Sequence, residues 1–377
     1  MRVNETSAPR VTWTELFYDL IIAASMLFLY GSLATHLTWG EFFWLSSIAL
    51  IVFGIWLSTT LIYNRLPNDG TGRRLLVIAQ MVAIVFAVAS MERSDRVDGD
   101  VGLVALGGAL FLLSFMWFQV ARQSSMAGKS DRIPAFAALV GGIFLITSAV
   151  LPDWINQAQV LAGGLIAFVP LFVLYLPLIV ANLDLDMRHL SERLGQLTLI
   201  MLGETFLEMA VIFTKGAEPR MFGVLIVLAI LVLIWWQYFT YVGTRPVRET
   251  SARIDVYLLG HALLVVGLGS AALSLTEIAL AVGEQLSLPL IAGMLGISLA
   301  GTYGGMALVV VSTPAPAKVL LPLLMAALCF LVLSALLRFV FTIDELVTGL
   351  LMTLVALVTL VVTAVSCRGS VGRSQVS

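Results

Sequence analysis

The feature that most constrains the fold is a series of twelve apolar runs, each close to 20 residues long. A helix needs about 20 apolar residues to cross ~30 Å of hydrocarbon, whereas a barrel strand needs about ten alternating residues. These runs are too long for barrel strands and do not alternate, so they predict membrane-spanning helices. The predicted spans are 15–35, 41–63, 73–91, 101–121, 133–151, 158–181, 192–214, 220–242, 253–282, 287–311, 317–339 and 345–366.

Composition supports a membrane environment. The 377 residues are 60% hydrophobic and only 12% charged, against about 25% charged residues in soluble domains. A lipid-exposed backbone must satisfy its own hydrogen bonds, which helices do within one segment. We therefore predict an all-α polytopic bundle of about twelve spans. The first 14 residues are mostly polar, so we expect no cleavable signal peptide.

The distribution of basic residues predicts the orientation. The two ends and alternate connections hold 16 of the 21 Lys and Arg residues. Basic residues accumulate on the cytoplasmic side of membrane proteins. We therefore expect a multi-pass protein of the cell (plasma) membrane with both termini in the cytoplasm.

A weak sequence similarity between the two halves of the chain suggests two parallel six-helix repeats. The region from Trp56 to Tyr63, followed by Arg73, resembles the region from Trp235 to Tyr238, followed by Arg253. Parallel repeats of this kind occur in some transporters. The predicted division is a tail at 1–14, a first half at 15–181, a cytoplasmic link at 182–191, a second half at 192–366 and a tail at 367–377.

Several kinds of chemistry are not indicated. A net charge of −2 argues against a nucleic-acid partner. His36, His189 and His261 are far apart and show no metal-ligand spacing, and no P-loop or hydrolase elbow occurs. We expect no metal, no cofactor and no enzymatic activity. Membrane lipid and an unidentified small molecule or ion are the expected partners, and the oligomeric state is left open. Cys329 is expected to be a small core residue.

Two acidic residues occur in the first apolar run. Glu15 and Asp19 are four residues apart and share one helix face. Thr12 and Glu15 fit a capping box, so we favour a capping role for Glu15. Asp19 lies one turn deeper. It is a candidate proton-relay or binding residue, with an interfacial carboxylate bound by a neighbouring Arg as the alternative.

A second acidic pair occurs in the seventh span, where Glu204 and Glu208 are also four residues apart. A carboxyl that can be neutral or charged near neutral pH is what a proton relay requires. For Glu204 the alternatives are a permanently protonated group or an ion pair with Arg338. Glu208 approaches the outer end of the span, which favours a structural role.

The ninth span carries a third candidate group. His261 has Tyr257 on its own face four residues earlier, and Asp255 lies near the membrane entry. A histidine can pass protons near physiological pH, but a lone histidine is more often a neutral hydrogen-bonding residue. Gln80 is interpreted as a polar side chain that holds helices together through interhelical hydrogen bonds.

Two packing features are also predicted. Pro170 and Pro177 should kink the sixth span. Gly301 and Gly305 form a GxxxG pattern, which allows two helix backbones to approach closely.

Three separated motifs resemble the low-temperature-requirement A (LtrA) family. Residues 13–20, Trp-Thr-Glu-Leu-Phe-Tyr-Asp-Leu, are similar to its opening motif. Glu192-Arg193-Leu194-Gly195, followed by Leu202-Gly203-Glu204, is similar to its second motif, with Leu194 in place of Phe. Asp255, Tyr257 and His261 match a third, and Arg74 with Gln80 fits the third-helix pattern. The resemblance covers about residues 11 to 365. It implies a bacterial inner-membrane protein linked to growth in the cold, without an established reaction.

Three hypotheses for function follow. The first is a proton-coupled transporter, which rests on acids and a histidine inside a many-helix bundle. The second is a non-catalytic membrane or assembly factor that supports growth in the cold. The third is a membrane-embedded enzyme, which would need a nucleophile or metal constellation that the sequence does not contain.

Overall fold

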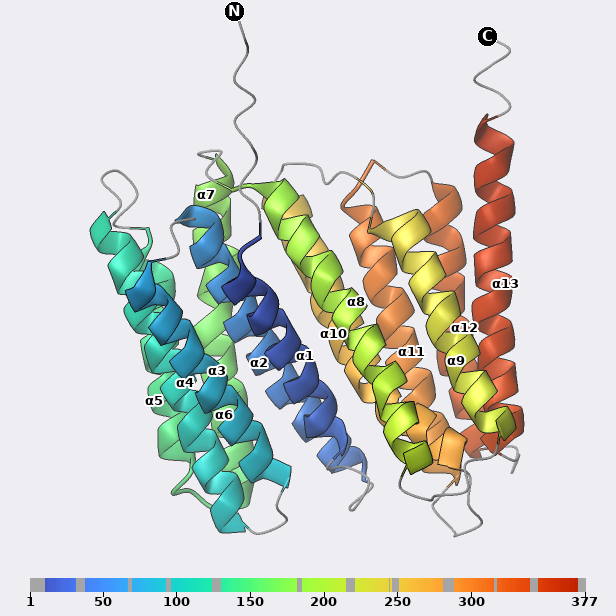
Figure 1. Cartoon of the computed structure of the whole chain (residues 1–377), viewed down its shortest axis with the longest axis horizontal. Helices are drawn as coiled ribbons and strands as arrows, with labels where there is room; N and C mark the ends of the chain where they lie inside the picture. Colours follow the sequence, from blue (N-terminus) through green and yellow to red (C-terminus); the bar gives the residue numbers. More distant parts are fainter. Residues whose placement is uncertain are drawn as a thin grey trace, which may run out of the picture. The chain divides into compact units, whose positions relative to one another are not determined.

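The computed structural model describes residues 11–31, 38–66, 70–92, 96–123, 130–181, 185–214, 221–243, 245, 251–280, 288–314, 317–339 and 345–371. Within these ranges all regular secondary structure is helical (Figure 1). The first seven rods are α1 (Trp13–Gly31), α2 (Trp39–Arg65), α3 (Thr71–Glu92), α4 (Arg96–Gln123), α5 (Arg132–Ser148), α6 (Asp153–Pro170) with its continuation α7 (Leu176–Ala181), and α8 (Met187–Thr214). The remaining rods are α9 (Met221–Gln237), α10 (Ser251–Leu280), α11 (Leu288–Val311), α12 (Ala317–Phe339) and α13 (Glu345–Val371).

Each predicted span coincides with one of these rods, so the prediction of a polytopic helical bundle is confirmed. Within the described part of the chain, ten helices are long and apolar enough to cross a membrane. The two remaining rods are α5, which is apolar but has 17 residues, and α8. The protein is a multi-pass helical membrane protein.

A π-helical turn interrupts the sixth rod between Pro170 and Pro177, and the predicted kink stays a prediction. α6 ends at Pro170, and the next five residues, Leu171–Tyr175, form one turn of π-helix before α7 begins. Proline has no backbone N–H and its ring clashes with the preceding turn; the wider turn comes just before Pro177, on α7, and relieves the clash of that ring.

The described chain divides into two compact units. Unit 1 contains Met1–Ser25 and Ile51–Leu197, and unit 2 contains Met26–Leu50 and Thr198–Ser377. Helices α1, α2 and α8 each contribute residues to both units. Within unit 1, α3, α4, α5 and α6 pack as successive neighbours. Within unit 2, α10, α11, α12 and α13 do the same, and α9 packs on α10 and α13. The internal repeat remains a prediction.

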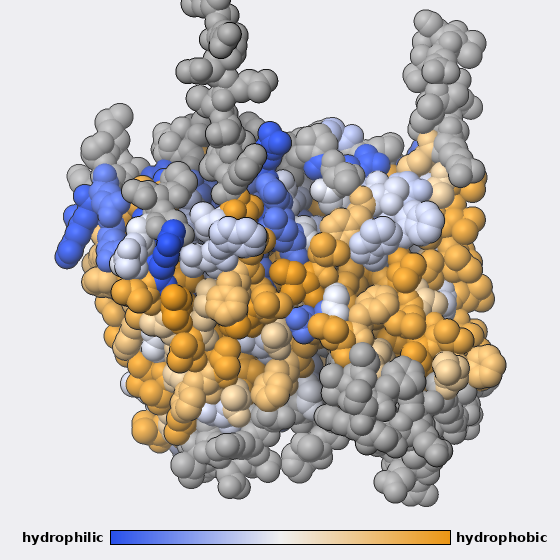
Figure 2. Space-filling model, in the orientation of Figure 1, coloured by the Kyte–Doolittle hydropathy of each residue, from blue (hydrophilic) through white to orange (hydrophobic). Residues whose placement is uncertain are grey.

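Apolar side chains cover much of the exposed helix surface. Figure 2 shows that hydrophobic residues (orange) predominate on the visible face and that most of the strongly hydrophilic residues (blue) lie in its upper part. α12 and α13 carry many exposed large apolar residues, among them Leu321, Met325 and Val358. Cys329 is also exposed, so the expectation of a core position is wrong. An apolar run in a membrane protein does not distinguish a lipid-facing from a core-facing side, because both environments are apolar.

Glycines allow α10 and α11 to approach closely. A methyl carbon at Gly305 would lie 2.5 Å from the Gly260 carbonyl oxygen and 2.6 Å from the Leu264 amide nitrogen. At Gly267 it would lie 2.6 Å from the Thr302 amide nitrogen. At Gly301 the nearest atom is 3.7 Å away, so the predicted close approach forms at one end of the GxxxG pattern.

We expect Gly305→Ala to lower the melting temperature of the purified protein in detergent. The added methyl group has no space, and overpacking of this kind costs about 1–3 kcal/mol. Gly304→Ala is the matched control, because nothing lies within 4 Å of its methyl position. In that control the gain in helix propensity should leave stability equal or higher. Equal melting temperatures for the two variants would contradict the close approach at Gly305.

Candidate functional site

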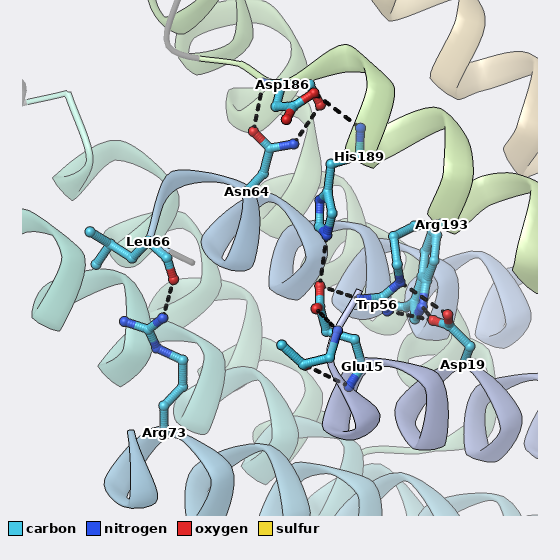
Figure 3. Close-up of polar contacts among 10 residues, drawn as sticks. Glu15, Asp19, Trp56, Asn64, Leu66, Arg73, Asp186, His189 and Arg193 are labelled. Atoms are coloured by element: carbon cyan, nitrogen blue, oxygen red, sulfur yellow. Dashed lines mark hydrogen bonds and ion pairs between the residues drawn. The ribbon is translucent and has the colours of Figure 1, made fainter. Parts of the chain in front are cut away.

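The central feature of unit 1 is a buried ionic cluster formed by Glu15, Asp19, Trp56, His189 and Arg193 (Figure 3). Glu15 and Asp19 come from α1, Trp56 from α2, and His189 and Arg193 from the first turns of α8. Asp19 and Arg193 are fully buried, Glu15 is 2% exposed and His189 is 7% exposed.

The spacing of the charged residues explains why they meet. Glu15 and Asp19 are four residues apart on α1, and His189 and Arg193 are four residues apart on α8. Residues with this spacing lie one helical turn apart on the same face. An acidic face of one helix therefore opposes a basic face of another.

The Arg193 guanidinium is the centre of the cluster. Its Nε donates to Asp19 Oδ2 at 3.0 Å, and its Nη2 donates to Asp19 Oδ1. Its Nη1 donates to Glu15 Oε1 at 2.6 Å. The planar guanidinium thus binds Asp19 in the bidentate arrangement and has a third donor for Glu15. One cation thereby pairs with both carboxylates and offsets part of the cost of burying them.

The indole of Trp56 completes the environment of Asp19. Its Nε1 donates to Asp19 Oδ1 at 2.6 Å, and the Arg193 guanidinium carbon lies 5.7 Å from its ring centroid. Asp19 therefore receives hydrogen bonds from two helices while an aromatic face covers the cation.

His189 contacts the most accessible side of the cluster. Its Nε2 lies 3.2 Å from Glu15 Oε1, and its Nδ1 is buried without a hydrogen-bond partner among the described residues. Sequence reasoning missed His189, because the three histidines were compared only with metal-ligand spacing. The informative pattern was its four-residue spacing to Arg193.

The N-terminus of α8 is fixed by Asp186 and Asn64. Asp186 Oδ1 accepts the backbone N–H groups of Arg188 and His189. Asn64 on α2 donates to the Asp186 carbonyl and accepts its N–H, at 2.7 and 2.8 Å. These caps start α8 at Met187, five residues before the predicted span, and so place His189 on the helix.

Glu15 has two roles in the structure. Thr12 N–H donates to Glu15 Oε2 at 2.9 Å, and Glu15 N–H donates to Thr12 Oγ1 at 3.3 Å, so the capping box forms. The other carboxylate oxygen is the one that binds Arg193 and His189. A local sequence pattern identifies the first role but contains no information about the second.

Gln80 lies in the same unit and joins four helices. Its Oε1 accepts from Tyr18 on α1 at 2.8 Å and from Thr59 on α2 at 3.0 Å. Gln80 itself lies on α3, and its Nε2 donates to the Ala109 carbonyl on α4 at 3.3 Å.

Two further residues of the sequence motifs, Arg74 and Glu192, are exposed and lie outside the ionic cluster.

The other candidates lie in unit 2. Glu204 is half-buried, and the side chain of Glu208 is outside the described residues. Asp255 is also half-buried, and its Oδ1 is buried without a hydrogen-bond partner among the described residues. Of the predicted third motif, the structure brings together Tyr257 and His261, whose rings lie 4.4 Å apart.

His261 is held by two hydrogen bonds. Its Nδ1 lies 2.9 Å from the Tyr257 carbonyl oxygen, which can only accept, so Nδ1 carries the proton. In the neutral ring, Nε2 then accepts from the Tyr238 hydroxyl at 2.9 Å. Tyr238 begins a π-helical turn, Tyr238–Val242, and Gly243 leaves room for its ring. Sequence reasoning noted Tyr238 only as part of an aromatic run.

We expect Tyr238→Phe to lower the free energy of unfolding by about 1–3 kcal/mol, because it leaves the buried Nε2 of His261 without a donor. Tyr257→Phe is the matched control, since the bond from His261 goes to its backbone carbonyl. Chemical denaturation in detergent measures both. A larger loss for Tyr257→Phe than for Tyr238→Phe would contradict the assigned hydrogen bonds.

The fold and the cluster define a multi-pass helical membrane protein with a buried ionic site formed by α1, α2 and α8. The family model of the bacterial low temperature requirement A protein (LtrA) matches residues 10–364, nearly the whole chain. The chain therefore belongs to the LtrA family, as the three sequence motifs indicate.

A relative in Rhizobium meliloti (strain 1021), the uncharacterized protein RA0937, is 24% identical over 260 residues. That similarity covers 63% of this chain and 60% of the relative's length. The chain thus spans less than two thirds of the relative it matches.

Proposed function

We propose that this LtrA-family protein is a proton-coupled membrane transporter of a small molecule or ion. The Glu15–Asp19–His189–Arg193 cluster is its proton-exchanging site. The observation that carries the proposal is the charge of the cluster. The formal charges of two carboxylates and one guanidinium sum to −1 while the imidazole is neutral. One added proton brings the net charge of the cluster to zero. A buried site of this kind gains by accepting one proton.

The contacts suggest a path for that proton. His189 is the most exposed of the charged residues and lies in the first turn of α8. In the cationic ring, Nε2–H gives its proton to Glu15 Oε1, and Nδ1–H remains, leaving a neutral imidazole and a neutral carboxyl. The cationic ring forms beforehand, when a hydronium ion protonates the neutral imidazole at Nε2 and leaves a water molecule, so the cluster gains one proton in all. The distribution of basic residues supports an opening toward the cytoplasm of the inner membrane, with both termini on that side.

The proposal predicts proton movement that depends on the cluster. Purified protein in liposomes with an internal pH dye and an imposed potential should conduct protons, and His189→Gln and Glu15→Gln should each reduce the flux at least about tenfold, since each removes a proton-transfer group. Glu192→Gln is the matched control, because this exposed carboxylate is next to Arg193 but outside the cluster. Glu204→Gln tests the acid of unit 2 in the same assay.

Equal flux in all variants, or none in the wild type, would contradict a proton-exchanging cluster. The second candidate, a non-catalytic membrane factor, is favoured by the three hydrogen bonds from Arg193 to carboxylate oxygens, an arrangement that is typical of a structural ion pair. It predicts that His189→Gln is silent in the flux assay and in growth in the cold, while Asp19→Asn destabilises the protein.

A further inference from the structure

The surface of unit 2 contains an apolar groove between α12 and α13. Its volume is about 710 Å³. The wall from α12 includes Leu321, Met325 and Cys329, and the wall from α13 includes Leu354 and Val358. Met325, Leu354 and Val358 are each more than half exposed, so the groove opens outward.

Polar groups are concentrated at one end of the groove. Lys318 and Ser366 line that end, whereas the opposite end is lined by Cys329 and Leu354. Lys318 is the only charged residue among those that line the groove, and its side chain is exposed. The groove therefore has one cationic mouth and an apolar floor.

The length of the groove matches one leaflet of a bilayer. From Leu354 to Ser366 the chain rises about 18 Å at 1.5 Å per helical residue. Half of the ~30 Å hydrocarbon core is about 15 Å. A single acyl chain lying in the groove would thus place its headgroup beside Lys318.

From this arrangement we propose that the groove binds one anionic phospholipid, with an acyl chain between α12 and α13 and the headgroup phosphate paired with Lys318. Charge complementarity favours this occupant over a second copy of the chain. The sequence of α12 contains no acidic residue, and that of α13 contains only Glu345, at the end remote from Ser366. The same face of a second copy would therefore offer Lys318 no anionic partner.

Native mass spectrometry of the purified full-length protein, equilibrated with equal amounts of phosphatidylglycerol and phosphatidylcholine, tests the site. We expect one retained lipid per chain and an approximately fivefold preference for phosphatidylglycerol, the effect typical of one Lys near a membrane surface. Lys318→Gln should abolish the preference but retain a lipid. Met325→Trp should fill the groove, so that neither phosphatidylglycerol nor phosphatidylcholine is retained.

Two matched controls accompany these variants. Leu328→Trp changes another exposed apolar residue of α12 outside the groove, and Arg122→Gln removes an exposed cation of α4. Both should behave as the wild type. If Met325→Trp does not fold, Val358→Trp fills the groove from the opposite wall.

Equal retention of the two lipids by the wild type would overturn the proposal, as would an unchanged preference in Lys318→Gln. A dimer that Met325→Trp dissociates would instead identify a second copy as the occupant. Because the assay measures lipid retention and not flux, its result is independent of the proton-transport proposal.

Discussion

The ion pairing of Arg193 with two carboxylates is the interaction on which unit 1 depends. A guanidinium, two carboxylates and an indole N–H are buried together, and the pairing of the opposite charges lowers the cost of burying each of them. Satisfying them fixes the rotation of α1, the start of α8 and the position of Trp56. The Asn64–Asp186 pair and the Gln80 hydrogen bonds extend the same constraint to α2, α3 and α4. Specificity in an otherwise apolar bundle is thus concentrated in a few polar contacts.

The two units use different means to hold their helices together. In unit 2, glycines at 260, 267 and 305 allow α10 and α11 to pack backbone to backbone, and His261 links α10 to the π-helical turn after α9. Close packing of small residues is the usual route to helix association in lipid. Unit 1 adds a buried ionic site to such packing.

The sequence was sufficient to predict the helices but only part of the cluster. Apolar runs determine span number and position, because hydrocarbon thickness fixes the length of a spanning helix. Glu15, Asp19 and Arg193 were each identified, yet their pairing joins residues 174 to 178 positions apart. Local patterns carry no information about such a pairing. Cys329 and the groove beside it escaped prediction for a different reason: lipid-facing and core-facing positions have the same composition.

A double-mutant cycle on thermal and chemical stability tests the central claim most directly. Arg193→Met should destabilise the wild-type protein by about 3–5 kcal/mol, because it leaves two buried carboxylates uncompensated. In a Glu15→Gln/Asp19→Asn background, which removes both negative charges, the same substitution should cost far less. If Arg193→Met were equally costly in both backgrounds, the guanidinium would not be acting through Glu15 and Asp19, and the ionic cluster could not be the constraint around which unit 1 is built.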